Sequence, residues 1–595
     1  MCGICGIFSE NQSHFNALKA MNDKLIHRGP DGEGFFYSTP IALAHRRLSI
    51  IDLSDKGKQP MHYLNRYTIT YNGEIYNYIE LKKELENNGY LFESHTDTEV
   101  IMAAYDCWGT DCLNRFNGMW AFVLFDSQTQ QVLISRDRLG IKPLYYYQKN
   151  GLFAFASEIK ALLVHPEIST AIRKDWCQEY LKNGLFKISN HTEYDLSAYQ
   201  DIHEFKASHF VLTNVNTAIY KSLNFQRYWE IPANYDNESY NETKLNQYLE
   251  EYRYLLNDAV RIRLRSDVPV GTALGGLDSS IISHLINQNK SGTAKQMTFS
   301  SVYRSENTKY CDESEFINKL SQHLKVENQQ IEPTDRDVLT DHQKVIYAMD
   351  IPVNSSCLSG WNTFKLISQS PVKVTLDGQG ADEILAGYLS YLIFYLSGLS
   401  LKNWLKQTQI YGTLPGTKTY LIKSLLLKYM RGAGFSTGFI RDKLRLTHDS
   451  PHINQVLKED LLSSFRLLLF YGDRESMAFS VESRLPYCDY RLIELMLNMP
   501  VEYKLHQGWT KYLSRKAFEN ELPHEIIWRK DKMGWAIPDT YWFNHLYKGT
   551  VLKSIQQSEF ARSLLSKKQF EQLPHHYNLM FRAYNLSVWG MMNDF

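Results

Sequence analysis

The chain opens with MCGICGIF (residues 1–8), which places Cys2 directly after the initiator methionine. A small residue at this position normally permits removal of Met1, so we expect Cys2 to become the first residue. An α-amino group has a reference pKa of ~7.7–8.0 and a thiol one of ~8.5, so the amine can take the thiol proton without a histidine. A CxxC metal or redox pair of Cys2 and Cys5 is the alternative, but no His-rich segment with suitable spacing lies nearby. The stretch therefore favours an N-terminal cysteine nucleophile.

Four further motifs follow MCGICGIF in order: HRGPDGEG (27–34), HRRLSIIDLS (45–54), YNGEIYN (71–77) and HTDTEV (95–100). Together they resemble the class II glutamine amidotransferases, which are N-terminal-nucleophile glutaminases. The resemblance implies that Cys2 attacks the side-chain amide of glutamine.

This resemblance assigns roles to five more residues. The side chain of Asn72 and the backbone N–H of Gly73 would stabilise the oxyanion that forms during attack on a carboxamide. Arg47 would bind the α-carboxylate of glutamine, and Glu74 and Asp97 its α-ammonium group. Each of these charged residues taken singly would be read as a solvated surface charge; the ordered set of motifs favours the binding roles.

Up to about residue 210, short apolar or alternating runs are separated by Gly, Pro, Asn and Asp, which predicts a β-rich region with hairpins. One helix is predicted in TDTEVIMAAYDCWG, with Thr96 or Asp97 as its cap. Residues 213–243 are polar and are interrupted by Pro, Asn and Asp residues. We therefore expect a glutaminase domain at 1–212, a linker at 213–243 and a second domain at 244–595. In the second domain, long amphipathic segments alternate with the runs VPVGTAL, QMTFSSVY and VKVTL, which predicts a parallel sheet flanked by helices.

The second domain carries a glycine-rich turn in DVPVGTALGGLDSS (267–280). Such a turn at the start of a helix offers backbone N–H groups to a phosphate. It resembles the pyrophosphate loop SGGxDS of ATP pyrophosphatases, with Leu274 where the first serine is expected. The resemblance assigns ATP and pyrophosphate binding to Gly275, Gly276, Asp278, Ser279 and Ser280.

Later segments resemble asparagine synthetases. In LDGQGADEILAGY (376–388), Asp377 and Gly378 would contact ATP, and Asp382 and Glu383 would bind Mg²⁺. Gln379 stands where relatives commonly have a glutamate, and an ordinary polar turn is the alternative for the whole motif. TFSSVY (298–303) places Ser301 on the adenine side. In WRKDKMGWAIP (528–538), Lys532 would stabilise charge on an adenylated intermediate, with Lys530 and Arg529 as rivals.

The segment DRESMAFSVESRLPYCDYRL (473–492) also follows the family order. We expect its charged and polar residues to act mainly as scaffold, through buried charge pairs that hold helices together: Asp473, Arg474, Ser476, Glu482, Arg484 and Asp489.

The resemblance covers almost the whole chain. It implies an α+β N-terminal-nucleophile sandwich (αββα), followed by an α/β adenine-nucleotide hydrolase-like domain with a parallel sheet and extra helices. The implied activity is glutamine-dependent synthesis of asparagine from aspartate, with ATP as co-substrate and Mg²⁺. Gln379 and Ile351, at positions where relatives often carry acids, keep another acceptor carboxylate open, such as a sugar acid or a peptide intermediate. Leu274 keeps open a glutaminase or nucleotide-binding protein with impaired synthesis.

Composition narrows the partners. Lysine plus arginine equals aspartate plus glutamate at 65 each, so there is no global field for nucleic acid or an anionic membrane, and we expect neither as a partner. Eight cysteines in 595 residues and the absence of a secretory pattern favour a reducing cytoplasm. The uncharged run 384–401 is predicted to be a buried helix rather than a membrane span. A homodimer is an expectation by analogy with the family.

Overall fold

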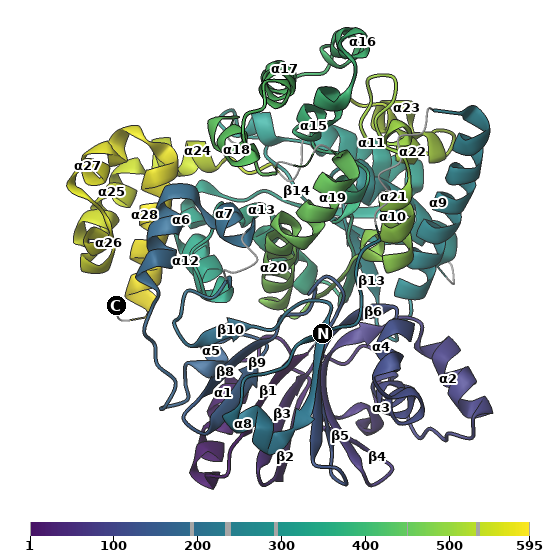
Figure 1. Ribbon diagram of the computed structural model, residues 1–595, viewed down its shortest axis with the longest axis vertical. Coiled ribbons are helices and arrows are strands. Elements are labelled where there is room, and N and C mark those ends of the chain that lie inside the picture. Colours follow the sequence, from purple (N-terminus) through teal and green to yellow (C-terminus); the bar gives the residue numbers. More distant parts are fainter. Residues whose placement is uncertain are drawn as a thin grey trace.

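The computed structural model describes residues 2–190, 195–232, 240–290, 295–444, 446–448, 450, 452–530 and 536–593. A β-rich region is formed by the first part of the chain, and a helical region built on a separate sheet follows from residue 242 (Figure 1). The prediction of a β-rich first part and a helix-flanked sheet in the second is confirmed.

The N-terminal region contains two six-stranded antiparallel sheets. The first has the order β10-β8-β9-β1-β3-β2, with the strands β1 Gly3–Phe8, β2 Gly32–Ser38, β3 Ile41–Arg47, β8 Tyr145–Lys149, β9 Leu152–Ala156 and β10 Ile202–Glu204. The second has the order β12-β11-β7-β6-β5-β4, with the strands β4 Met61–Tyr63, β5 Tyr67–Ile75, β6 Gly118–Asp126, β7 Gln131–Arg136, β11 His209–Asn214 and β12 Gln226–Arg227.

Alternating side chains of β1 show why the two sheets stack. Ile4 and Phe8 point into the apolar layer between the sheets. Cys5 and Ile7 point the other way, into a core shared with α1 (Leu18–Asp23) and α5 (Ile159–Leu162). Successive side chains of a strand face opposite sides, so a strand with apolar residues at every position must be covered on both faces.

The outer face of the second sheet is covered by α2 (Tyr78–Asn87) and α3 (Asp97–Trp108). The layers are therefore helix, sheet, sheet and helix, and the predicted αββα sandwich is confirmed (Figure 1). Helix α3 begins where the sequence predicted, because the hydroxyl of Thr96 caps it by accepting a hydrogen bond from the backbone N–H of Glu99.

The stretch 213–243, for which we expected a linker, contains ordered elements in its first part. Strand β11 runs to Asn214, helix α8 covers Val215–Tyr220, and β12 pairs with β11. The second sheet therefore reaches residue 227, before the long helix α9 (Glu242–Arg263) begins.

A five-stranded parallel sheet forms the centre of the second region, in the order β15-β14-β13-β16-β17. Its strands are β13 Val270–Ala273, β14 Met297–Ser301, β15 Glu327–Ile331, β16 Val374–Leu376 and β17 Glu482–Arg484. Three of them, β13, β14 and β16, lie in the runs predicted as strands. Parallel strands need long crossovers, and helices supply them here.

Most of the remaining helices lie in the second region, and three of them, α4, α6 and α7, come before residue 242. Their bounds are α4 Cys112–Arg115, α6 Lys174–Asn183, α7 Leu185–Asn190, α10 Leu277–Asn289, α11 Ser314–Leu324, α12 Val338–Met349, α13 Leu358–Ser368, α14 Ala381–Ile384, α15 Tyr391–Gly398, α16 Leu401–Tyr411, α17 Lys418–Gly432, α18 Thr437–Leu444, α19 Ile453–Leu462, α20 Ser464–Met477, α21 Tyr490–Asn498, α22 Tyr512–Ala517, α23 His524–Ile527, α24 Asp539–Tyr541, α25 Lys548–Gln557, α26 Glu559–Leu564, α27 Lys567–Gln572 and α28 Tyr577–Met592.

The uncharged run 384–401 is broken after α14 and resumes as the short helix α15. The side chains of residues 391–396 are buried in the main core of the second region, as expected for this run. Among the residues that the structure describes, no helix is both long enough and apolar enough to cross a membrane.

Candidate active sites

A small cavity of about 40 Å³ lies at Cys2. Cys2 stands directly before β1, and residues from three of the four later motifs join it in lining the cavity: Arg47, Tyr71, Gly73, Glu74, Thr96 and Asp97. The backbone nitrogen of Cys2 donates a hydrogen bond to Oδ1 of Asn72 at 3.0 Å, and Nε of Arg28 donates to the carbonyl oxygen of Cys2 at 3.1 Å. The backbone of the candidate nucleophile is thus held from both sides.

The amide of Asn72 has one end free for a ligand. Its Oδ1 is bound to Cys2, whereas its Nδ2 is buried and has no hydrogen-bond partner among the described residues. An unpartnered buried donor costs free energy, which a developing oxyanion would offset. Gly73 follows on β5, where an added Cβ would lie 2.2 Å from the carbonyl oxygen of Met119. Only glycine therefore fits beside Asn72.

The thiol of Cys2 is partly buried. Burial raises its pKa above the ordinary value, and its Sγ lies 3.9 Å from the carbonyl oxygen of Leu48. A buried thiol stays protonated at neutral pH. The nucleophile therefore needs a base that removes its proton as it attacks.

The cavity has a cationic end and an acidic end. Nη1 of Arg47 donates to the carbonyl oxygen of Ser54 at 2.8 Å, and Nη2 donates to that of Asp52, so the guanidinium is fixed. Asp97 accepts hydrogen bonds from the hydroxyl of Tyr71 and the N–H of Ile75, both at 2.8 Å, yet burial raises its pKa to about 6.

Glu74 belongs to the acidic end and is tied to the other half of the chain. Burial and the neighbouring Asp97 raise its pKa well above the ordinary value, while Nη2 of Arg484 donates to its Oε2 at 3.2 Å. Its Oε1 is buried without a hydrogen-bond partner among the described residues. Glu74 thus keeps one oxygen for a cationic ligand.

Glu482 also lines this cavity, although it lies on β17 of the second region. Burial alone would raise its pKa, but neighbouring positive charges, Arg484 among them, hold the pKa at about 2. Nε of Arg484 donates to Oε1 of Glu482 at 2.6 Å. We expected Glu482 and Arg484 to be scaffold; the structure adds Glu482 to the wall of the first cavity. Their spacing in ESR puts them on one face of a strand, but sequence alone does not show which face.

Other residues of the same segment form a buried ionic network between the two regions. Arg28 contacts Asp473 at 2.9 Å and Glu158 at 2.8 Å, and Arg474 contacts Glu158 at 2.7 Å. Lys160 and Arg474 both contact Asp350, at 2.9 and 3.2 Å. Removing one member would leave a buried charge uncompensated, so the network fixes how the two regions meet.

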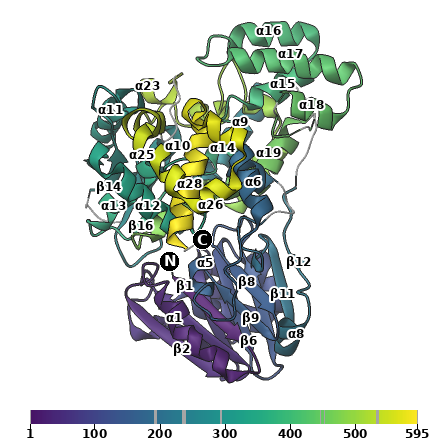
Figure 2. The same cartoon turned by 90° about the vertical axis from the view of Figure 1, so that its left-hand side faces the viewer.

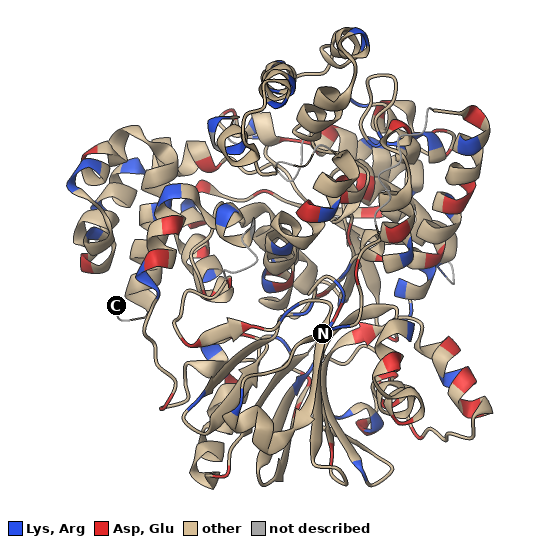
Figure 3. Cartoon of the chain, viewed as in Figure 1, with Lys and Arg blue, Asp and Glu red and all other residues tan. Residues whose placement is uncertain are grey.

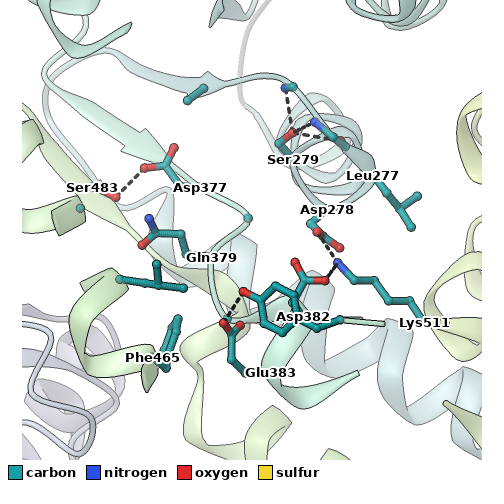
Figure 4. Close-up of a pocket in the computed structure, with 18 of the residues that line it drawn as sticks. Leu277, Asp278, Ser279, Asp377, Gln379, Asp382, Glu383, Phe465, Ser483 and Lys511 are labelled. Carbon is teal, nitrogen blue, oxygen red and sulfur yellow. Dashed lines mark hydrogen bonds and ion pairs between the residues drawn. The ribbon is translucent and has the colours of Figure 1, made fainter. Parts of the chain in front are cut away.

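A second cavity, of about 400 Å³, lies at the carboxyl ends of β13 and β16 (Figure 4). Ligands in parallel α/β sheets bind outside this edge. Its lining includes most of the predicted ATP and metal residues: Gly275, Gly276, Asp278, Ser279, Asp377, Gly378, Asp382 and Glu383.

The glycine-rich turn is ordered by Ser279. Its Oγ accepts hydrogen bonds from the N–H groups of Gly275 and Gly276, each at 3.1 Å, at the start of α10. The second loop packs closely against it, since a Cβ on Gly378 would lie 2.9 Å from both Cβ of Asp278 and the nitrogen of Ser279. Two loops that follow neighbouring strands therefore meet to form the floor of the cavity.

Lys511 is a cation of this cavity that sequence reasoning missed. Its Nζ lies 2.6 Å from Oδ2 of Asp278 and 2.8 Å from Oδ1 of Asp382 (Figure 4). Burial would lower its pKa, but the two carboxylates raise it, so the ammonium is retained. The segment TKYLSRKAF (510–518) gave little signal, because one lysine among several charges looks like surface.

Glu383 lines the cavity without approaching Lys511. It accepts a hydrogen bond from the hydroxyl of Tyr388 at 2.8 Å, and burial together with Asp382 raises its pKa to about 7. The predicted pair of Asp382 and Glu383 is therefore split, and Asp278 is the carboxylate that faces Asp382 across Lys511.

Three other positions singled out in the sequence, Ser280, Ser301 and Leu274, place no side chain in the lining of the large cavity. The hydroxyl of Ser280 donates to the carbonyl of Gly276, and Ser301 binds the carbonyl of Ser359; neither lines the large cavity. The side chain of Leu274 is buried in the core beneath the loop. Lys532 lies outside the described residues. Its rival Arg529 contacts Glu313 at 2.7 Å.

A cysteine at the start of a four-layer sandwich, followed by a parallel sheet with a glycine-rich turn at its carboxyl edge, is the architecture of a glutamine amidotransferase of the asparagine synthetase type. Sequence profiles agree: the glutamine amidotransferase domain matches residues 1–229, and asparagine synthase matches residues 251–593. The chain belongs to the asparagine synthase family, whose members use ATP as a co-substrate.

Curated relatives align over most of the chain. Asparagine synthetase [glutamine-hydrolyzing] 3 of Bacillus subtilis is 31% identical, over 96% of this chain and 93% of the relative. A putative asparagine synthetase [glutamine-hydrolyzing] 2 of Methanocaldococcus jannaschii is 37% identical, over 66% of this chain and 77% of the relative. Amidase chyE of Penicillium rubens is 27% identical, over 87% of this chain and 84% of the relative. Relatives that align over most of this chain are thus named both as asparagine synthetases and as an amidase.

Proposed function

We propose that the chain is a glutamine-dependent asparagine synthetase: it hydrolyses glutamine at Cys2 and uses the ammonia to amidate an adenylated aspartate, releasing AMP and pyrophosphate. The observation that carries this proposal is the alternation along β17. Glu482 lines the cavity at Cys2, and the next residue, Ser483, lines the large cavity. One short strand therefore belongs to both candidate sites.

In the first cavity, Arg47 would bind the α-carboxylate of glutamine, and Glu74 with Asp97 its α-ammonium. After removal of Met1, the nitrogen of Cys2 would be an amine that accepts the thiol proton while sulfur attacks the amide carbon. Nδ2 of Asn72 and the N–H of Gly73 would donate to the oxyanion. The proton passes to the leaving nitrogen as ammonia departs, and water hydrolyses the thioester to glutamate.

In the second cavity, the glycine-rich turn and Lys511 would hold the phosphates of ATP. An oxygen of the acceptor carboxylate attacks the α-phosphorus, and pyrophosphate leaves. Ammonia then attacks the acyl carbon, and AMP leaves with the bonding electrons. Activation is needed because a carboxylate is a poor acyl electrophile.

The acidic residues of the second cavity fit Mg²⁺. Oδ1 of Asp278 is buried without a hydrogen-bond partner among the described residues, and Asp382 faces the same ammonium. Hard cations that bridge phosphates take one or two carboxylates and complete their shell with phosphate and water oxygens. When bound, Mg²⁺ would neutralise charge on the phosphates. Asp278 and Asp382 are the first choice as its ligands, with Glu383 as the originally expected alternative.

Another acceptor carboxylate is the second candidate. Gln379 lines the large cavity where a glutamate is common, and apolar side chains form part of the wall: Phe364, Phe465 and Leu468. These favour an acceptor with an apolar or ring-shaped part. Impaired synthesis is less favoured, since the side chain of Leu274 points into the core and removes no group from the cavity.

Product analysis tests the proposal. Purified protein receives glutamine, aspartate, ATP and Mg²⁺, and glutamate, AMP, pyrophosphate and asparagine are followed together. We expect all four products, and Cys2→Ala should make asparagine from added ammonia only. Glutamate without asparagine would reject aspartate as the acceptor, and a screen of sugar acids and peptide carboxylates for AMP release would then test the second candidate.

A further inference from the structure

The segment 401–444, called the tip below, comprises α16, α17 and α18 and projects from the second region. In both views α16 and α17 lie at the end of the molecule farthest from the N-terminal sheets (Figures 1 and 2). It contributes no residue to the lining of either candidate site.

The tip exposes large apolar side chains. Ile422 is 62% exposed and Tyr429 is 70% exposed, and with Leu425 and Leu426 they form a stripe along one face of α17 at helical spacing. The full set is Leu401, Leu405, Ile422, Leu425, Leu426, Tyr429, Phe435 and Phe439. Contiguous exposed apolar groups of this size mark contact sites.

The exposed stripe lies on a different face of α17 from the side chains that pack into the core. The opposite side of α17 packs inward, where Leu427 and Ser424 are buried, and Nε1 of Trp404 on α16 donates to Oγ of Ser424 at 3.0 Å. The helix therefore has one apolar side for its own core and a second that the described residues do not cover. The packing of α17 within the described residues therefore does not account for this exposed apolar face.

Positive charge is concentrated in the same segment. Residues 401–444 contain eight Lys and Arg and one acid, Asp442, whereas the rest of the chain contains 57 basic and 64 acidic residues. Lys402, Lys406 and Lys418 are exposed. Figure 3 shows blue segments on α16 and α17, and neither helix contains an acidic residue. The tip therefore has a net charge of +7 (8 basic minus 1 acidic residue), and the rest of the chain has a net charge of −7 (57 basic minus 64 acidic residues). The two charges cancel in the total.

We propose that the tip docks onto the surface of an anionic lipid bilayer, with the stripe of α17 inserted among the headgroups and the lysines beside it on lipid phosphates. Aliphatic and aromatic side chains next to lysines are the composition of helices that lie in a membrane interface. We expected no membrane partner because the net charge of the whole chain is zero. The net charge does not show that basic residues are concentrated in one segment.

Two other occupants fit less well. A second copy joined by a two-fold axis would place the same patch on both partners, so that two clusters of cations would face each other. An acidic protein would satisfy the charge, but a helix that presents an apolar stripe to a protein commonly lies in an apolar groove of that partner, which would have to be acidic as well. A deformable anionic surface accepts such a projection without a matching groove.

Vesicle co-sedimentation tests the proposal with the full-length protein. We expect binding to vesicles of phosphatidylglycerol and phosphatidylcholine, little binding to pure phosphatidylcholine, and loss of binding at high salt. Ile422→Glu with Tyr429→Glu should lower the affinity tenfold or more, since burial of one large apolar side chain corresponds to at least about tenfold. Leu91→Glu is the matched control, because Leu91 is 84% exposed in the N-terminal region.

Charge is tested separately by Lys402→Glu with Lys406→Glu, which should weaken binding to anionic vesicles and leave the salt dependence shallower. All variants should melt at the wild-type temperature and keep glutaminase activity. No binding to anionic vesicles, or equal binding by wild type and the Ile422/Tyr429 variant, would overturn the proposal. So would self-association in sedimentation velocity that the same variant abolishes, since the second copy would then be the occupant.

Discussion

Nη2 of Arg484 lies 3.2 Å from Oε2 of Glu74, although 410 positions separate the two residues in the chain. The same guanidinium binds Oε1 of Glu482 at 2.6 Å and the carbonyl oxygens of Arg263 and Arg265 at 2.7 and 2.6 Å. A side chain of the ATP-using domain therefore sets the position of a carboxylate proposed to bind glutamine.

Arg484→Met should destabilise the protein by about 3–5 kcal/mol, because it leaves two buried carboxylates without their cation. The KM for glutamine should rise with it, since Glu74 loses its orientation. Thermal melts and glutaminase kinetics give the two readouts. Adding Glu482→Gln to Arg484→Met should cost less than the sum of the single changes, because the two residues are coupled. An unchanged melting temperature in Arg484→Met would contradict the description of this pair.

Asn72→Ala should lower kcat for glutamine hydrolysis by about 10²–10³, the usual loss for one oxyanion donor. Ammonia-dependent amide formation should stay within a few-fold of wild type, since the ATP cavity is untouched. Asn77→Ala is the control from the same motif, because among the described residues its amide hydrogen-bonds to the backbone of Arg115 and Asn117 and it does not line the cavity. Equal losses in both variants would show that the motif acts through folding alone.

Glutamine binding should weaken at acidic pH. Burial raises the pKa of Asp97 to about 6, so its charged form is present above that pH and is lost as the pH falls through it. The ammonium of glutamine needs this charge, and the KM should therefore rise by up to roughly tenfold per pH unit below 6 and level off above 7. Asp97→Asn should have a high KM and should lose the transition near pH 6. A flat wild-type profile would exclude Asp97 from the ammonium site.

Lys511→Met should abolish ATP-dependent synthesis from ammonia while glutaminase activity remains. The change removes a cation from the proposed phosphate site and leaves Asp278 and Asp382 facing each other, so a loss of roughly 10²-fold or more is expected. Lys511→Arg should recover part of the activity. Pyrophosphate release with ammonia as nitrogen donor is the measurement, and wild-type rates in Lys511→Met would remove this residue from the site.

Leu274→Ser restores the common family residue but should not raise turnover. The side chain of Leu274 is buried in the core, so the change should cost about 2–5 kcal/mol, as large-to-small core changes do. Denaturant unfolding and AMP release test the two parts. Faster AMP release in Leu274→Ser would show that a serine hydroxyl reaches the phosphates from this position.

The residues that line the cavity at Cys2 could be found from the sequence because they come from motifs with strong local constraints. Gly73 is required by contact with a neighbouring strand, and Thr96 caps α3. The phosphate loop was predictable for the same reason. Lys511 and Glu482 were not, because their importance arises from which segments meet in space. Asp382 and Glu383 both line the large cavity, and Asp382 forms an ion pair with Lys511 whereas Glu383 accepts a hydrogen bond from Tyr388; their role as metal ligands stays a prediction.

Because Glu482 of the second region lines the cavity at Cys2, the N-terminal region is not a complete module for protein engineering. A fragment cut after the N-terminal sheets would keep the cysteine and the amide of Asn72 but would expose the acidic end of its pocket to water. Glutaminase modules exchanged between members of the family would inherit a mismatched wall in the same way. The unit that can be transplanted is therefore the whole chain, or an N-terminal domain redesigned to close its own pocket.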